Sequence, residues 1–408
     1  MTKKVVWIIC QYAAPLKYGF GSRHFYLAEE WIKQGYEVTI FTSSFNHFIH
    51  TKPVINGNYT YEKINDITVC WVKGNTYRKP SGLGRVFSWL LFSLRMLWIR
   101  VGDEVKKPDV IIVSSPSIFP IINGYLFKRK FKSKLIMEIR DIWPLTLTTI
   151  GKYPKGHPLI VVLSWLEKFA YSKSDFIVST MPKADLHVRE VVNNDFNFKC
   201  IPQGIDKEIL KETQSVLNPS FEENFPKDKF IIGYAGTIGA ANNLETLIET
   251  AKCFEKSGLR QFHFLILGDG YKKEELQQSA AGLSNVSFLG KVAKKDVKPF
   301  LEKCHVLYDG VKSTPLYQFG LSRNKWVDYM LSGRPIIVSY TGYVSMINEA
   351  NCGLVVPAED VEALKNALQS YLFMSNDQLN EIGLRGKKYI IENRTFDKLA
   401  LSYSELFN

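Results

Sequence analysis

Short apolar runs recur along the chain, each followed by a turn and an amphipathic stretch. The first run, VVWIIC (5–10), shows no alternation with polar residues, which is typical of a strand buried on both faces of a parallel sheet. A glycine-rich turn follows it and leads into a helix that ends at Gly35. Comparable runs predict strands at 36–43, 67–74, 109–115, 133–141, 174–181 and 197–206. This alternation predicts a doubly wound α/β domain over residues 1–205.

The second half of the chain repeats the pattern after a polar stretch. Residues 206–228 are charged and contain two prolines, so we expect a linker there. Apolar runs then predict strands at 230–236, 263–270, 286–290, 304–310, 335–339 and 352–357, with a helix near 243–257. We expect a second Rossmann-like domain over 229–385, facing the first across a cleft, and two closing helices over 386–408.

The composition excludes several classes of protein. With 46% hydrophobic and 13% aromatic residues, the chain is neither disordered nor fibrous. Its six cysteines form no CxxC pair, which favours reduced thiols in a cytoplasmic protein over disulfides or a zinc site. The first apolar run is too short for a signal peptide, and we expect no membrane-spanning helix because no apolar segment reaches 18 residues.

The net positive charge of the chain lies in its first half. Residues 1–200 contain 28 Lys and Arg against 15 Asp and Glu, whereas residues 201–408 contain 24 against 25. The asymmetry indicates an anionic partner for the first half: nucleic acid, a membrane surface or a phosphorylated substrate.

The stretch 83–101 is the most apolar helix that the pattern predicts. Arg85, Arg95 and Arg100 share one arc with Trp89 and Phe92. The opposite arc, which we expect to pack on the sheet, contains Val86, Phe87, Leu90, Leu91, Leu94, Leu97, Trp98 and Val101. A crossover helix explains the apolar arc, but aromatic residues beside arginines suit a lipid headgroup region, and we expect membrane contact here.

A basic run follows at 125–134, with five cations at Lys128, Arg129, Lys130, Lys132 and Lys134. The plain alternative is a solvated helix end. Cations beside aromatic bulk also suit an anionic leaflet, where each contributes about 1 kcal/mol. The sequence contains no nucleic-acid-binding signature, so we expect an anionic membrane surface and no nucleic acid as the partner.

The segment GLSRNKWVDYMLSGRPIIVS (320–339) predicts an anion site. A helix is expected to start near Asn324, so that free backbone N–H groups lie between Arg323 and Lys325. Amide donors, a helix dipole and two cations suit a diphosphate. Asp328, one turn later, is placed to accept hydrogen bonds from a ribose diol. The alternative is a surface helix with an ordinary cap.

Two segments of the first half carry further candidates. In MEIRDIWP (137–144), Arg140 and Asp141 end a strand at the carboxyl edge of the sheet, where ligand crevices form; a simple Arg–Asp surface pair is the alternative. In YGFGSRHFYLA (18–28), Gly19 and Gly21 would let the chain approach a phosphate or an acceptor closely.

The segment 320–339 resembles the donor-binding segment of glycosyltransferase family 4, a retaining family with the GT-B fold. It is most similar to a subgroup of bacterial O-antigen and capsule N-acetyl-L-fucosamine transferases that reads G-x-S-x-N-K-x-x-(E/D)-Y-M-x-x-G-x-P-I. The resemblance implies that Asp328 holds the nucleotide ribose and that Lys325 contacts the donor phosphates. Gly320 stands where the family has a glutamate that meets the donor sugar, so the contact with the sugar differs there.

Other segments extend the resemblance over nearly the whole chain. GYAGTIGAANNLETLIE (233–249) is similar to the family's phosphate loop, which implies that Gly236, Thr237 and Gly239 bind the donor. Ile238 and Asn243 stand where many members have Arg and Lys, so the cationic role would fall on Arg323 and Lys325.

Three more matches assign further residues by resemblance. LILGDGYKKEEL (265–276) implies that Gly268 and Gly270 lie near the nucleobase, and MINEANCGLVVPAED (346–360) implies that Glu349 lies near the donor. The motif R-D-x-W-P of the subgroup implies that Asp141 lies near the acceptor hydroxyl, either as a base or to orient it.

The expected enzyme transfers a sugar from a UDP-sugar with retention, using Asp141, Arg323 and Lys325 in catalysis. The subgroup's usual reaction adds an N-acetylated deoxyhexosamine to a polyprenyl-diphosphate-linked saccharide of lipopolysaccharide O-antigen or capsule. We therefore expect a peripheral protein on the cytoplasmic face of the inner membrane. No cofactor and no metal is expected, since the sequence contains no D-x-D triplet.

Two rival functions stay open. A nucleotide-sugar 2-epimerase would have the same architecture, but it would need histidines and carboxylates gathered at the cleft, and the seven histidines form no such cluster in the sequence. A non-catalytic nucleotide-sugar-binding subunit is the other alternative, because the family's glutamate is absent at Gly320.

Overall fold

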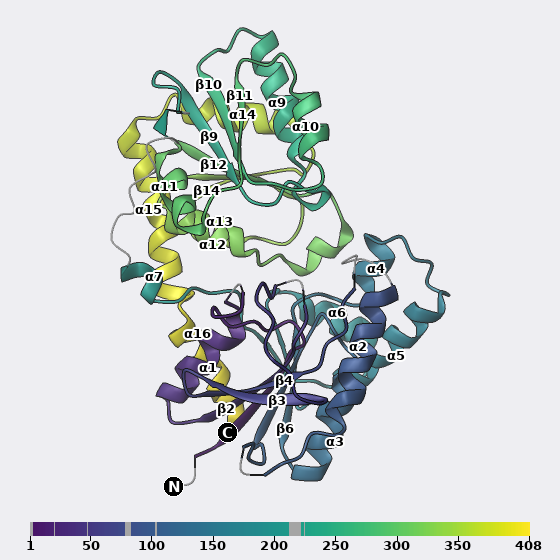
Figure 1. Ribbon diagram of the computed structural model, residues 1–408. Coiled ribbons are helices and arrows are strands. Elements are labelled where there is room, and N and C mark those ends of the chain that lie inside the picture. Colours follow the sequence, from purple (N-terminus) through teal and green to yellow (C-terminus); the bar gives the residue numbers. More distant parts are fainter. Residues whose placement is uncertain are drawn as a thin grey trace. The chain divides into compact units, whose positions relative to one another are not determined.

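The computed structural model divides the chain into two compact units (Figure 1). The first unit contains residues 1–204 and 396–408, and the second contains 205–395. The structure describes residues 3–19, 21–46, 48–77, 83–102, 104–211, 222–223 and 225–408. Part of the expected linker, from 212 to 221 and at 224, lies outside these residues.

The first unit is built on an eight-stranded sheet in the order β3-β4-β2-β1-β5-β6-β7-β8. Its strands are β1 (Val5–Ile9), β2 (Glu37–Ser43), β3 (Tyr59–Ile64), β4 (Ile67–Val72), β5 (Val110–Ser114), β6 (Lys134–Ile139), β7 (Phe176–Ser179) and β8 (Phe198–Cys200). All neighbours are parallel except β3, which pairs antiparallel with β4 at the edge. The strand order reverses between β1 and β5, which makes that point the switch point of the sheet.

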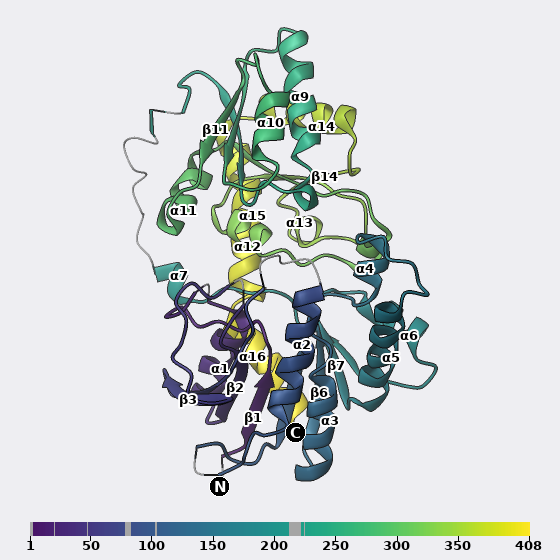
Figure 2. The ribbon, with the colours of Figure 1, turned by 45° about the vertical axis from the view of Figure 1, so that its right-hand side comes forward.

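Helices cover both faces of this sheet (Figure 2). The helices of this unit are α1 (Arg23–Lys33), α2 (Leu83–Met96), α3 (Ile121–Phe131), α4 (Leu145–Thr149), α5 (Pro158–Lys173), α6 (Ala184–Val191) and α16 (Phe396–Ser404), with a final 3₁₀ turn η3 (Glu405–Phe407). Alternate residues of β1 show the two layers. Trp7 contacts Phe127 of α3, whereas Val6 and Ile8 belong to the core formed with α1 and α16.

The second unit contains a six-stranded, wholly parallel sheet in the order β11-β10-β9-β12-β13-β14. Its strands are β9 (Phe230–Ala235), β10 (Phe262–Leu267), β11 (Val286–Gly290), β12 (Val306–Gly310), β13 (Ile336–Ser339) and β14 (Gly353–Val356). Here the order reverses between β9 and β12. The carboxyl ends of these two strands therefore define the position where a ligand crevice is expected.

Helices and 3₁₀ turns connect these strands. They are α7 (Glu208–Lys211), η1 (Ala240–Asn242), α9 (Leu244–Lys256), α10 (Lys273–Ser279), α11 (Lys294–Lys303), η2 (Pro315–Phe319), α12 (Asn324–Leu331), α13 (Met346–Glu349), α14 (Val361–Leu372) and α15 (Asn376–Asn393). The prediction of two doubly wound α/β domains is confirmed. The expected closing helices differ from the prediction, because α15 begins before residue 386 and α16 packs in the first unit, where Trp31 Nε1 donates to the Ala400 carbonyl at 3.0 Å.

The orientation predicted for α2 is wrong. The arc that contains Trp89 and Phe92 is the buried one: these side chains are 1% and 2% exposed. The arc that we expected to pack on the sheet is largely exposed, including Leu90 and Leu94. The cause is tertiary contact: Trp89 Nε1 donates to the Tyr12 hydroxyl at 2.6 Å, and the Trp89 ring contacts Trp143. Aromatic packing and a buried hydrogen bond orient the helix, not the larger apolar arc.

Candidate active-site residues

A buried carboxylate organises the carboxyl edge of the second sheet. Asp309, near the end of β12, is 0% exposed. It accepts hydrogen bonds from Lys325 Nζ at 2.9 Å and from Trp326 Nε1 at 2.7 Å, and Arg323 Nε lies 3.2 Å from its second oxygen. Asp309 therefore fixes both cations that the sequence predicted at the start of α12. Sequence reasoning missed it, although its place at a strand's carboxyl end was a usable signal.

Lys325 is held on three sides. Its Nζ donates to the Tyr234 hydroxyl at 3.0 Å and to Asn242 Oδ1 at 3.3 Å, and it lies 4.1 Å from the centre of the Tyr234 ring. Burial lowers the pKa of Lys325, and although Asp309 opposes that effect, the pKa is about 8. The ammonium group is therefore mostly charged at neutral pH and loses its charge in mildly alkaline solution.

Arg323 immediately precedes α12 and acts as its N-cap residue. Its guanidinium also hydrogen-bonds Asn242, and the Gly310 carbonyl accepts from Nη1 at 3.5 Å. Two cations thus surround one carboxylate beside the unsatisfied N–H groups of a helix start, which begins at Asn324 as predicted. The cluster carries a net positive charge when Lys325 is protonated, which suits a bound anion.

The predicted glycine loops lie together at the same edge. Gly236 N–H donates to the Leu267 carbonyl at 2.9 Å, and Ile238 N–H donates to the Asp269 carbonyl at 2.8 Å. Gly268 and Gly270 have φ angles of 142° and 159°, and a Cβ atom on Gly268 would lie 1.8 Å from the Gly236 oxygen. These glycines permit the close packing of two loops beside the cluster, in addition to any role toward a nucleotide.

Lys325 contacts the first of these loops. A Cβ atom on Gly236 would lie 2.8 Å from Lys325 Cε, so a side chain at that position would displace the lysine. Asn242, after Thr237 and Gly239 in the same loop, donates to the Thr237 carbonyl at 2.7 Å. The structure therefore brings Gly236, Thr237 and Gly239 to the neighbourhood of Lys325.

The other predicted donor residues differ in their surroundings. Asn324 and Asp328 are exposed on the first turns of α12. Glu349, at the end of α13, hydrogen-bonds Tyr389 and lies 3.4 Å from Arg394 Nη2, so it contacts α15 instead of the cluster around Asp309.

A shallow groove of about 580 Å³ lies at the same edge, formed by the loops that follow β12 and β13. Its lining residues are Ser313, Thr314, Pro315, Gln318, Thr341, Gly342 and Tyr343. None of them is charged at neutral pH, so the groove offers hydroxyl, amide and backbone groups to a ligand.

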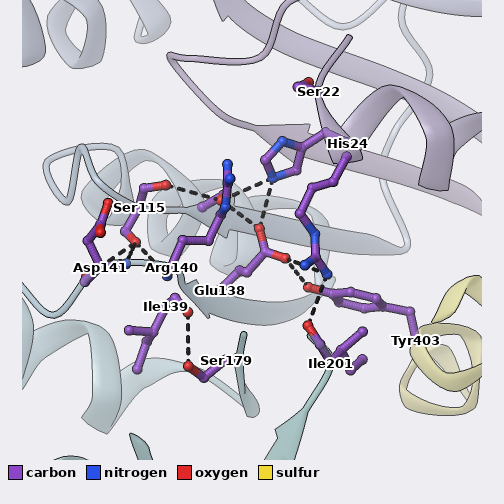
Figure 3. Close-up of polar contacts among 12 residues, drawn as sticks. Ser22, His24, Ser115, Glu138, Ile139, Arg140, Asp141, Ser179, Ile201 and Tyr403 are labelled. Carbon is purple, nitrogen blue, oxygen red and sulfur yellow. Dashed lines mark hydrogen bonds and ion pairs between the residues drawn. The ribbon is translucent and has the colours of Figure 1, made fainter. Parts of the chain in front are cut away.

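At the carboxyl edge of the first sheet, Arg140 and Asp141 follow β6 directly. Their backbone N–H groups both donate to Ser115 Oγ, at 2.8 and 3.1 Å, which fixes the turn that presents the two side chains (Figure 3). The Asp141 side chain is in contact with solvent. Surrounding protein raises the pKa of Asp141, while the nearby guanidinium groups of Arg140 and Arg85 oppose the rise.

Gly19 has a role that differs from the one expected. A Cβ atom at this position would lie 1.8 Å from the Phe48 carbonyl oxygen, and Gly19 pairs with Ile49 in an isolated bridge. Gly21 is likewise packed, against Tyr26 and Leu16. The close approach that these glycines allow is to the protein's own loop and side chains.

A second buried carboxylate, Glu138 of β6, was also missed by sequence reasoning. It accepts hydrogen bonds from His24 Nε2 at 2.8 Å, Ser114 Oγ at 2.6 Å and the Tyr403 hydroxyl at 2.6 Å (Figure 3). Arg23 Nη2 lies 3.4 Å away. Burial alone would raise the pKa of Glu138, but Arg23 and His24 hold it well below its usual value.

His24 is paired with the Glu138 carboxylate. Burial alone would lower the pKa of His24, but Cys10 and Glu138 outweigh the effect of burial and raise the pKa to about 8.

Among the residues that the structure describes, no three His, Cys, Asp or Glu side chains are arranged to hold a metal ion.

Comparisons with known proteins identify the class of enzyme. Residues 229–373 match the model of the family described as "Glycosyl transferases group 1". A sequence relative, named putative colanic acid biosynthesis glycosyl transferase WcaI, from Escherichia coli K12, is 24% identical over 303 residues, or 68% of this chain and 70% of the relative. The chain is a glycosyltransferase.

Solved structures agree on the fold of this glycosyltransferase. Sucrose-phosphate synthase from Thermosynechococcus elongatus superposes with a TM-score of 0.72 at 18% identity, covering 99% of this chain and 98% of that one. Anabaena Alr3699/HepE, solved in complex with UDP, gives 0.64 at 13% identity, covering 99% of both chains. The glycosyltransferase has the GT-B fold, with its two parallel-sheet domains.

Proposed function

We propose that the chain binds a UDP-sugar through the second unit and transfers the sugar with retention of configuration. The observation that carries this proposal is the pair of cations that Asp309 fixes at the start of α12, beside the glycine loop of β9. The relative HepE was solved with UDP, and with UDP-glucose in another structure, which supports a nucleotide-sugar donor. Arg323 and Lys325 would contact the diphosphate, and Asp328 the ribose.

The proposed mechanism uses these groups to stabilise the leaving diphosphate. Negative charge develops on its oxygens as the bond between sugar and phosphate breaks, and Arg323, Lys325 and the amides of α12 stabilise that charge without a metal. Loss of one such donor costs on the order of 3 kcal/mol in activation free energy. The acceptor hydroxyl attacks from the face of the leaving group, while Asp141 accepts its proton or orients it.

We propose that the donor sugar is an N-acetylated deoxyhexosamine, held by neutral groups. Gly320 occupies the position where the resemblance implies a glutamate, so that carboxylate is absent. The groove at residues 313–318 and 341–343 contains no charged side chain. Hydroxyl and amide groups suit a sugar whose polar substituents are an acetamido group and hydroxyls.

The proposed acceptor is a polyprenyl-diphosphate-linked saccharide of a bacterial surface polysaccharide, O-antigen or capsule, at the cytoplasmic face of the inner membrane. The colanic acid relative supports a polysaccharide product, and the resemblance to family 4 supports the lipid-linked acceptor. The net charge of +13 over residues 1–200 supports an anionic surface or substrate for the first unit. Among the described residues, no helix is long and apolar enough to span a membrane.

Calorimetry with UDP tests the donor site. We expect Arg323→Ala combined with Lys325→Ala to weaken UDP binding by more than about 100-fold, whereas Lys388→Ala, an exposed cation of α15, leaves it unchanged. Equal affinities in the two variants would remove the assignment.

Transfer assays test the reaction. Labelled UDP-sugars are incubated with a lipid-diphosphate-linked saccharide, and products are separated. Transfer supports the proposal, isomerisation of the donor alone identifies an epimerase, and binding without turnover identifies a non-catalytic subunit. The anomeric configuration of the product, measured by NMR, tests retention.

A further inference from the structure

Three helices of the first unit, α2, α3 and α5, form a continuous layer on one face of the sheet (Figures 1 and 2). Asn123 of α3 donates to the Ser93 carbonyl of α2 at 2.9 Å. Tyr125 of α3 packs edge-on against Phe169 of α5, with ring centres 5.1 Å apart. The outer surfaces of the three helices therefore form one surface, which we call the helical face.

The part of the helical face that α2 contributes is an apolar stripe. Its exposed side chains follow one another at helical spacing, so they share one side of the helix. They are Phe87, Leu90 and Leu94 of α2, followed by Leu97 and Trp98 of the turn directly after the helix, with exposed fractions between 41% and 60%. This stripe is the larger apolar arc of the helix, which explains why the inverted orientation of α2 matters: the fold buries Ser88 and Ser93 and leaves leucines outside.

Helix α5 repeats the arrangement independently. Val161, Val162 and Trp165 are 56%, 46% and 58% exposed and lie on one side of the helix. Ile150 precedes α5 in the chain and is 58% exposed, and Leu126 of α3 is 47% exposed. Two apolar stripes in one layer of helices, on either side of α3, exceed the scattered exposed residues that a soluble surface normally carries, and such surfaces mark interaction sites.

The exposed charged side chains of α2, α3 and α5 are all positive. The sequences of α2, α3 and α5 contain one acidic residue, Glu167, which is buried and accepts from His187 at 2.7 Å. Cations are exposed on the same helices at Arg129, Lys130 and Lys168. Lys128 is not among these exposed cations, because it is half-buried and bonded to Asp175 at 2.6 Å. Apolar side chains bordered by cations complement the surface of a membrane with anionic headgroups.

A second copy of the chain fits this face poorly. A symmetric dimer places the same patch of each subunit against the other, so it would bring Arg129, Lys130 and Lys168 of both copies together, and the three helices supply no exposed carboxylate to compensate them. Like charges in a partly dehydrated interface repel one another. The charge pattern therefore selects an anionic occupant.

We propose that the helical face docks in the headgroup region of an anionic lipid membrane, with the stripes of α2 and α5 entering the outer acyl region. The proposal deepens the proposed function, because it names the surface that holds the enzyme where a lipid-linked acceptor lies. It corrects the surface expected from the sequence: Trp89 and Phe92 face the core, and Phe87, Leu90, Leu94, Leu97 and Trp98 face the lipid.

Co-sedimentation of the full chain with vesicles tests the apolar part. The vesicles are phosphatidylcholine alone, or phosphatidylcholine mixed with phosphatidylglycerol. We expect binding to the mixed vesicles, and a partition coefficient more than about tenfold lower for Leu94→Gln with Trp98→Gln. The matched control, Phe373→Gln with Leu384→Gln, removes two exposed apolar side chains of the second unit and should bind like wild type.

The charged part has its own variant. Arg129→Gln with Lys130→Gln and Lys168→Gln should lose most of the preference for phosphatidylglycerol and most of the dependence of binding on salt. Brominated acyl chains should quench part of the tryptophan fluorescence in wild type and less of it in Trp98→Gln.

Two outcomes overturn the inference. One is equal vesicle binding by wild type and Leu94→Gln/Trp98→Gln; the other is a stable dimer in solution that the same variant dissociates. UDP affinity is measured on every variant, so that the two proposals fail separately. Lost vesicle binding with intact UDP binding supports the docking surface, whereas intact vesicle binding in a protein that never binds UDP contradicts the donor site alone.

Discussion

Each unit buries one carboxylate completely beside the carboxyl edge of its sheet, but the two have different neighbours. Around Asp309 the side chains of Arg323 and Lys325 are 17% and 13% exposed, so each keeps some contact with solvent that a ligand can replace. Around Glu138 the partners Arg23, His24 and Tyr403 are themselves buried. A buried charge must be compensated in both places, yet only the first arrangement leaves positive charge at the surface.

The comparison teaches how to separate a binding site from a structural network. Burial of a carboxylate beside cations is common to structural and functional groups. The exposure of the partners differs: a partner that reaches water can exchange it for substrate, whereas a partner with no access to solvent can only hold the fold. On this criterion we assign the proposed donor site to the cluster around Asp309, and we assign Glu138 a structural role in the first unit.

Glu138→Gln should give the largest effect. It leaves Arg23 and His24 buried without their counter-charge, which costs about 3 to 5 kcal/mol in the free energy of unfolding. Urea unfolding, followed for the first unit, measures it, with the exposed Glu190→Gln of α6 as control. UDP affinity of the folded variant should not change. A loss of UDP affinity without a loss of stability would reverse the assignment of the two carboxylates.

Asp309→Asn comes next. Without the carboxylate, Arg323 and Lys325 lose the group that positions them, and we expect kcat to fall by about 100-fold, or about 3 kcal/mol. The pKa of Lys325, about 8, should fall further because Asp309 raises it.

The pH profile separates this role from a merely structural one. UDP affinity needs the protonated lysine, so it decreases as the pH rises through about 8 in wild type. In Asp309→Asn this decrease should begin at lower pH, whereas the exposed Asp377→Asn should leave the profile unmoved. An unshifted profile in Asp309→Asn would show that the carboxylate does not control the lysine.

Asp328→Ala should have an intermediate effect. Loss of a charge-assisted hydrogen bond to the ribose costs about 2 kcal/mol, so the Kd for UDP should rise roughly 30-fold. Calorimetry with UDP and with uracil distinguishes the ribose contact from a general loss of the site. Unchanged UDP affinity would contradict the ribose assignment.

The smallest effect concerns the pH dependence of stability through His24. Its pKa of about 8 in the folded protein exceeds the ordinary value near 6.5. This stabilisation is therefore fully present below about pH 6.5 and is lost as the pH rises through 8, a change of about 1 to 2 kcal/mol in the free energy of unfolding. His24→Gln should flatten this part of the curve of unfolding free energy against pH. If His24→Gln keeps the full slope, a group other than His24 titrates in this range.

The sequence predicted most strands and the helix start at Asn324, because both depend on local signals. Continuous apolar runs between turn residues identify buried parallel strands, and polar residues before an apolar helix identify its start. The edge strand β3 was not predicted, since its side chains are mostly half-buried and its polar residues give no continuous apolar run. Its pairing with β4 depends on a neighbour, not on its own pattern.

The misses share a cause in tertiary contacts. Asp309 and Glu138 stand in strands whose other residues are mostly apolar, and nothing local shows that Lys325 or Tyr403, 16 and 265 positions away, will reach them. The faces of α2 could not be assigned because both arcs contain large apolar side chains, and the contact of Trp89 with Tyr12 decides between them. Site residues identified by resemblance, such as Asp328 and Glu349, await the binding experiments.

The return of α16 to the first unit has a consequence for synthesis on the ribosome. Tyr403 and Phe407 belong to the first core, and Tyr403 completes the hydrogen bonds of Glu138. The N-terminal sheet therefore lacks a full set of partners until residues 396–408 have emerged, while residues 205–395 already contain a core of their own. The unit translated second can finish folding first, and the half-built N-terminal unit is the one that needs protection from aggregation during translation.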